Sequence, residues 1–127
     1  SDFGLAKSFG AAGCTQATIT RDQGVCGTPH YMAPEHVTLY KYVEPPTDVF
    51  EMAATMTHIL TGKTVRPIKR GQDPFKVVLE VRPRPFKELM PKCSEAFAEV
   101  MDTALAWDAK DRYQDGRAFL DAMKQVL

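Results

Sequence analysis

The clearest pattern of hydrophobic and polar positions lies between Thr47 and Thr61, where it predicts a long α-helix. Apolar side chains recur there at helical spacing, at Val49, Met52, Ala53, Met56, Ile59 and Leu60. Phe50 and Ala54 widen this stripe. A helix that is apolar over so much of its surface is predicted to be central and largely buried.

Capping residues bound this long helix and three later ones. Asp48 is the candidate N-cap of the long helix, with Glu51 three residues on, and Gly62 is its stop signal. The later candidate N-caps are Asp73, Ser94 and Asp115. The helix after Asp73 has Pro74 at its first position and is predicted to end near Val81. The chain is therefore predicted to be mainly α-helical.

The first part of the chain has a different character. The stretch from Leu5 to Gly24 is rich in small residues and has no apolar periodicity, which predicts a long loop. Loops of this length are usually functional or mobile. Four prolines between Pro29 and Pro46 leave room only for short helical turns.

Composition narrows the class of protein. The chain has 127 residues, 44% of them hydrophobic, which suits one domain with a real core. Sixteen basic residues balance sixteen acidic ones, which argues against a partner that is nucleic acid or a membrane surface. No apolar run approaches the ~20 residues of a membrane span. The three cysteines are too scattered for a disulfide framework, so a cytoplasmic location is expected.

Two groups of polar residues carry no clear chemistry in the sequence. The histidines, His30, His36 and His58, lack metal-ligand spacing and are interpreted as surface or packing residues. A basic run follows the long helix, at Lys63, Arg66, Lys69 and Arg70. This run is interpreted as a solvated face, because it lacks interleaved aromatic residues.

The most informative stretch is CGTPHYMAPEH, from Cys26 to His36. With DFG at positions 2–4 and TDVFEMA at 47–53, it resembles the eukaryotic-type serine/threonine protein kinase family in its bacterial form. The match continues through Arg112 to the end of the chain. The resemblance implies the helical C-lobe portion of the kinase fold, starting at Asp-Phe-Gly and without the N-lobe or the catalytic loop. It divides the chain into an activation segment (1–28), a docking loop with the Ala-Pro-Glu region (29–46) and a helical subdomain (47–127).

The resemblance implies ATP-dependent phosphoryl transfer to serine or threonine of a protein substrate, with ATP and Mg²⁺ as cofactors. Asp2 would be the catalytic carboxylate that holds the metal and, through it, the nucleotide phosphates. An ordinary Asp-x-Gly turn is the competing interpretation.

Three threonines take roles from the same resemblance. Thr20, and after it Thr18, are the candidate phosphorylation sites of the activation segment, although both could be unmodified loop threonines. Thr28 follows Gly27 and would hydrogen-bond the catalytic aspartate and lysine of the parent kinase, which favours serine/threonine specificity. A plain turn threonine is the alternative for Thr28.

Three further residues take structural roles. Glu35 of Ala-Pro-Glu is expected to pair with Arg112, because a buried carboxylate needs such a partner. Asp48 would brace the catalytic loop from beneath. Glu51 and Ala53 depart from the serine and glycine common in the family, a local mismatch.

The sequence lacks a glycine-rich phosphate loop, a Val-Ala-x-Lys strand and a His-Arg-Asp loop. The chain alone is therefore expected to be inactive, with the missing N-terminal half of the kinase domain as its partner. The alternative is a non-catalytic kinase-like module that binds other proteins through its helical lobe.

Overall fold

The computed structural model describes residues 29–38 and 43–127, and within these ranges every regular element is a helix. The α-helices are α2 (Pro34–Thr38), α3 (Pro45–Thr61), α4 (Pro74–Glu80), α5 (Phe86–Leu89), α6 (Glu95–Ala104) and α7 (Gly116–Val126). Two 3₁₀ turns accompany them: η1 (Pro29–Tyr31) precedes α2, and η3 (Ala109–Asp111) lies between α6 and α7. The predicted mainly helical class is confirmed.

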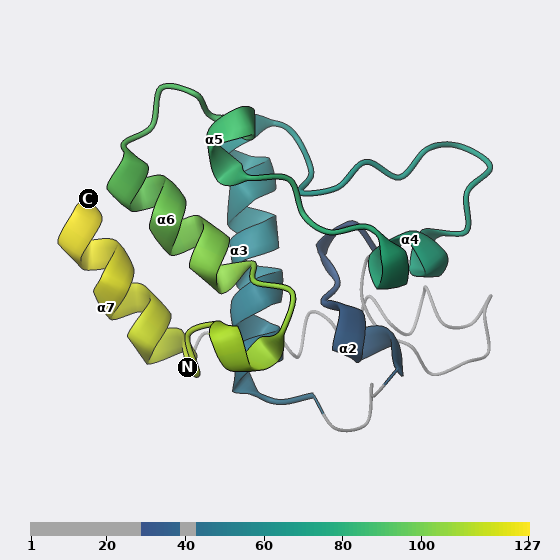
Figure 1. Cartoon of the computed structure of the whole chain (residues 1–127), viewed down its shortest axis with the longest axis horizontal. Coiled ribbons are helices and arrows are strands. Elements are labelled where there is room, and N and C mark those ends of the chain that lie inside the picture. The colour runs from purple at the N-terminus through teal and green to yellow at the C-terminus, as the bar shows by residue number, and fades with distance from the viewer. Residues whose placement is uncertain (1–28, 39–42) are drawn as a thin grey trace.

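Helix α3 is the axis of the arrangement. Helices α6 and α7 lie side by side on one flank of α3, and α2 and α4 lie on the other (Figure 1). The shared core contains Phe50 from α3, Phe86 from α5, Met101 from α6 and Phe119 from α7. Because α3 contacts both flanks, residues on its two sides can support the short segments that precede it.

The start of α3 differs from the prediction. The N-cap position is Glu44, whose side chain makes no capping hydrogen bond, and prolines occupy the first helical positions. Proline lacks the N–H that a cap would satisfy and its fixed φ suits a first turn, so the helix begins before Asp48. Asp48 lies inside the first turn, and its prediction as N-cap was wrong. Gly62 ends the helix as predicted, with φ of 72° and its N–H donating to the carbonyl of His58.

The buried face of α3 only partly follows the predicted stripe. Val49, Phe50, Ala53 and Ala54 are fully buried. Ile59, however, is 77% exposed and Leu60 is 46% exposed, so their predicted burial was wrong. At 100° per residue, Ile59 lies above Met52 on the side of the helix next to the buried face, and not within that face. A periodic pattern shows which residues share a side and leaves open which side is covered.

The later helices begin at their predicted caps. Side-chain oxygens of Asp73, Ser94 and Asp115 accept hydrogen bonds from backbone N–H groups two or three residues on, opening α4, α6 and α7. Helix α5 was not predicted. It is four residues long, and the N–H of Phe86 at its start donates to Asp102 Oδ1 on α6 at 2.8 Å, a contact between distant parts of the sequence.

Candidate functional site

The predicted site residues fall into two groups. Asp2, Thr18, Thr20 and Thr28 lie outside the described residues. Glu35, Asp48 and Arg112 lie within them, and two of the three, Glu35 and Arg112, meet directly. Within the described residues, the candidate site is therefore segment 29–38, which comprises η1 and α2, together with the side chains that hold it against α3.

Segment 29–38 is a compact chain of short turns. The N–H of Met32 donates to the carbonyl of Pro29, and the N–H of His36 donates to the carbonyl of Ala33. Met32 and Ala33, between the two turns, are 1% and 0% exposed. Such short turns have little stability of their own. Their position depends on contacts with the helical core.

The first of these contacts joins Glu35 to Arg112. Arg112 Nη1 donates to Glu35 Oε2 at 2.6 Å and Nη2 donates to Oε1 at 3.0 Å, a two-pronged pair. Thr47 Oγ1 on α3 donates to the same carboxylate at 2.6 Å. Burial raises the pKa of Glu35, but the hydrogen bonds from Arg112 and Thr47 outweigh it and hold that pKa below its ordinary value.

Arg112 binds three backbone carbonyls in addition to the carboxylate of Glu35. Its remaining N–H groups donate to the backbone carbonyls of Ala106, Pro46 and Trp107. All five donors of the guanidinium are thus used, and its carbon lies 4.9 Å from the ring centre of Phe50. The side chain is fully buried. Arg112 therefore fixes α2, the first turn of α3 and the connection after α6 relative to one another.

A second contact involves Glu51, which the sequence suggested as the capping-box partner of Asp48 and as a mismatch with the family. Glu51 Oε2 accepts from the N–H of Ala33 at 3.1 Å and lies 2.5 Å from His36 Nδ1. Burial lowers the pKa of His36, but its hydrogen bond to Glu51 and the nearby negative charges outweigh this and raise the pKa above its ordinary value. A carboxylate facing imidazole makes Nδ1 the donor.

The third contact joins Tyr31 to His58. The Tyr31 hydroxyl lies 2.6 Å from His58 Nδ1, and the two rings are 5.7 Å apart. His58 is on α3, one turn before its end. The interpretation of His36 and His58 as surface or packing residues was thus incomplete, because both form hydrogen bonds between elements.

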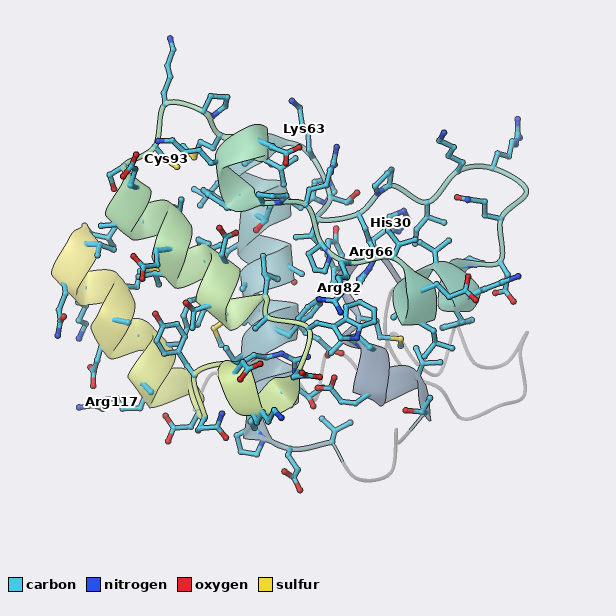
Figure 2. The ribbon with its side chains drawn as sticks, viewed as in Figure 1. His30, Lys63, Arg66, Arg82, Cys93 and Arg117 are labelled. Atoms are coloured by element: carbon cyan, nitrogen blue, oxygen red, sulfur yellow. The ribbon has the colours of Figure 1, made fainter. Side chains whose placement is uncertain are left out.

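The fourth contact comes from Arg66, in the connection after α3. Arg66 is fully buried, and its Nη1 and Nη2 atoms both donate to the carbonyl of Met32, at 3.2 and 2.7 Å. Figure 2 shows Arg66 lying inward between α3 and α4, while Lys63 extends outward. The solvated-face interpretation of the basic run was therefore wrong for Arg66. No local pattern distinguished Arg66 from its lysine and arginine neighbours.

Taken together, side chains from α3 and from residues after it bind segment 29–38 at Tyr31, Met32, Ala33, Glu35 and His36. Segment 29–38 is thereby held in a fixed position against the helical core. Within 29–38 and 43–127 no group of three or more histidine, cysteine or acidic residues could hold a metal ion. In the same ranges no helix is long and apolar enough to cross a membrane.

Comparisons with known proteins match the chain over nearly its whole length. A family model described as the protein kinase domain matches residues 1–126. The chain is similar to tyrosine-protein kinase MasK of Myxococcus xanthus, with 32% identity over 99% of this chain and 19% of MasK. It is also similar to serine/threonine-protein kinase PknA of Mycobacterium tuberculosis, with 30% identity over 99% of this chain and 27% of PknA. A third relative is mitogen-activated protein kinase 14 of Xenopus laevis, with 29% identity over 99% of this chain and 32% of the relative. The chain thus spans 19% to 32% of the length of these relatives.

Proposed function

The chain belongs to the protein kinase family, and we propose that it forms part of a serine/threonine kinase in which segment 29–38 docks the protein substrate. The observation that carries this proposal is the two-pronged pair between the buried Arg112 and the partly buried Glu35, with Thr47 on the same carboxylate. A surface that positions a peptide must be rigid to align its hydroxyl for reaction. Segment 29–38 has this property because side chains of α3 and of residues after it hold five of its residues.

The serine/threonine specificity rests on Thr28, which directly precedes segment 29–38 and follows Gly27. In the family resemblance this threonine belongs to the docking loop of serine/threonine kinases. The relatives are named for both specificities, MasK as a tyrosine kinase and PknA as a serine/threonine kinase. We therefore assign specificity from Thr28 and not from the relatives' names.

The proposed organisation follows the sequence. Residues 1–28 form the activation segment, with Thr20 as its first phosphorylation site and Thr18 as its second. Residues 29–46 contain the docking loop and the Ala-Pro-Glu region, and residues 47–127 form the supporting helical subdomain. Asp48, in the first turn of α3, braces the catalytic loop of the whole kinase. A cytoplasmic location suits the scattered cysteines of the sequence.

Asp2 is proposed to hold Mg²⁺ against the phosphates of ATP, where the metal neutralises the charge that develops during phosphoryl transfer. The 127-residue chain contains no glycine-rich loop, ATP-binding lysine strand or His-Arg-Asp loop. We therefore infer that it does not transfer phosphate by itself and acts together with the remainder of a kinase domain.

The experiment is a phosphotransfer assay on the full-length gene product, with labelled ATP, Mg²⁺ and a general protein substrate. Asp2→Asn is expected to abolish transfer. The matched control is Asp121→Asn, since Asp121 is an exposed α7 residue whose partner is the exposed Arg117. Transfer unaffected by Asp2→Asn would overturn the role of Asp2. Absence of transfer in the unmodified protein would favour the non-catalytic interaction module.

A further inference from the structure

Among the described residues, no carboxylate is hydrogen-bonded to the buried Arg66. The described hydrogen bonds of its side chain go to the carbonyl of Met32, and its guanidinium carbon lies 5.3 Å from the centre of the Phe50 ring. Its Nε atom is buried and has no hydrogen-bond partner among the described residues. Burial lowers the pKa of Arg66 to about 10, so the side chain still carries its charge at neutral pH. An apolar side chain would fill this space without the desolvation cost.

The position of the Met32 carbonyl explains what the charge accomplishes. The carbonyl of Met32 and the N–H of Ala33 belong to one peptide group. Arg66 donates two hydrogen bonds to the oxygen of that group, and Glu51 Oε2 accepts from its N–H at 3.1 Å. The cation therefore faces the negative end of the peptide dipole and the anion faces the positive end.

We propose that Arg66 and Glu51 form a charge clamp that fixes the plane of the Met32–Ala33 peptide and thereby positions the substrate-docking segment. Both are positioning residues and neither touches the reacting atoms. Rotation of the peptide plane would break both contacts at once and leave a guanidinium and a carboxylate without these partners. The inference rests on the proposed function only for its consequence in substrate binding, because the clamp itself is a property of the fold.

The two halves of the clamp have a shared support. Glu51 directly follows Phe50 on α3, and the Arg66 side chain lies over the Phe50 ring on its way to Met32. His36 binds the same Glu51 oxygen that Ala33 binds. The clamp therefore links both turns of segment 29–38 to a single turn of α3.

The test compares Arg66→Met, Arg66→Lys and Glu51→Gln in the full-length gene product. The matched control is Arg84→Met, because Arg84 donates to the carbonyl of Thr64 in the same connection and its described hydrogen bonds do not reach segment 29–38. Hydrogen exchange at the Ala33 amide reports on the clamp without requiring activity. Arg66→Met is expected to raise the exchange rate about tenfold, since hydrogen bonds from a charged donor are lost.

Arg66→Lys is expected to restore part of the protection, because its ammonium can donate one hydrogen bond to Met32. Glu51→Gln keeps an acceptor oxygen and loses the charge. Its exchange rate at the Ala33 amide is expected to lie between those of the wild type and Arg66→Met. Equal exchange in Arg66→Met and Arg84→Met would overturn the clamp. If Arg66→Met does not fold, Ala33 protection in Arg66→Lys and Glu51→Gln equal to that of the wild type would overturn it instead.

The kinetic consequence separates this inference from the proposed function. Arg66→Met is expected to raise KM for the protein substrate about tenfold and leave KM for ATP unchanged. A change in both constants would contradict a role confined to the docking segment. If the unmodified protein transfers no phosphate, the proposed function fails, while exchange at Ala33 still decides whether the clamp exists.

Discussion

Arg112 and Glu35 lie 77 positions apart in the sequence and form a two-pronged ion pair at 2.6 and 3.0 Å. One partner belongs to the short helix α2 and the other follows η3, close to the start of α7. This pair joins α2 to the residues that precede α7. Arg112 also binds the carbonyl of Pro46 in the first turn of α3. The position of segment 29–38 and the stability of the fold therefore both depend on the guanidinium of Arg112.

Arg112→Ala is expected to lower the free energy of unfolding by about 3–5 kcal/mol, because it leaves a partly buried carboxylate and several carbonyls without their partner. The control is Arg117→Ala, whose side chain is 81% exposed, and its effect should stay below about 0.5 kcal/mol. Urea unfolding of both variants measures the difference. Similar values for the two would contradict the assigned role of Arg112.

The hydroxyl of Thr47 is expected to contribute more to stability than the hydroxyl of Thr57, although both residues are buried. Thr47 donates to the charged carboxylate of Glu35, whereas Thr57 donates to the carbonyl of Ala53 in its own helix. Thr47→Val should cost about 1–2 kcal/mol and raise the pKa of Glu35, while Thr57→Val should cost less than about 1 kcal/mol. Chemical unfolding checks the order, and a larger loss in Thr57→Val would refute it.

The His36–Glu51 contact predicts a dependence of stability on pH. The pKa of His36 in the folded protein lies above its ordinary value of 6.5. The stabilisation is thus complete below pH 6.5 and is lost as the pH rises through the folded-state pKa.

The advantage of the wild type over His36→Gln, measured as the free energy of unfolding, should therefore be larger at about pH 6 than at about pH 9. His30→Gln is the control, since its described contact is a ring pair with Tyr31 at 6.5 Å. An advantage that grows with rising pH would show that His36 does not bind Glu51 as a cation.

Thr20→Ala is expected to lower the phosphotransfer activity of the full-length gene product several-fold, since phosphate on an activation segment orders it through arginine contacts. Thr18→Ala should have a smaller effect. Mass spectrometry of the purified protein should find more phosphate on Thr20 than on Thr18. Full activity in a Thr20→Ala protein would remove this threonine from the account.

Local signals in the sequence predicted the helices that depend on local chemistry. Asp73, Ser94 and Asp115 cap through hydrogen bonds that stay within three residues, and Gly62 stops α3 through its own left-handed backbone. Helix α5 depends on Asp102 of another helix, so its start had no local signal.

The contacts that hold segment 29–38 were much harder to predict from the sequence. The resemblance to kinases suggested Glu35 and Arg112 as partners, but no spacing rule connects residues so far apart. Arg66 stands among other basic residues, and its burial is decided by the position of Phe50 and Met32 in space. Glu51 differed from the family pattern, and only the fold shows that it binds Ala33 and His36.

The most direct test of the account is phosphate transfer by the full-length gene product to two peptide mixtures, one containing serine and threonine and the other only tyrosine as acceptors. We expect Mg²⁺-dependent transfer from ATP to the serine/threonine mixture, abolished by Asp2→Asn and retained in Asp121→Asn. Transfer confined to tyrosine would contradict the assigned specificity. No transfer to either mixture would contradict the assignment of this chain to an active kinase.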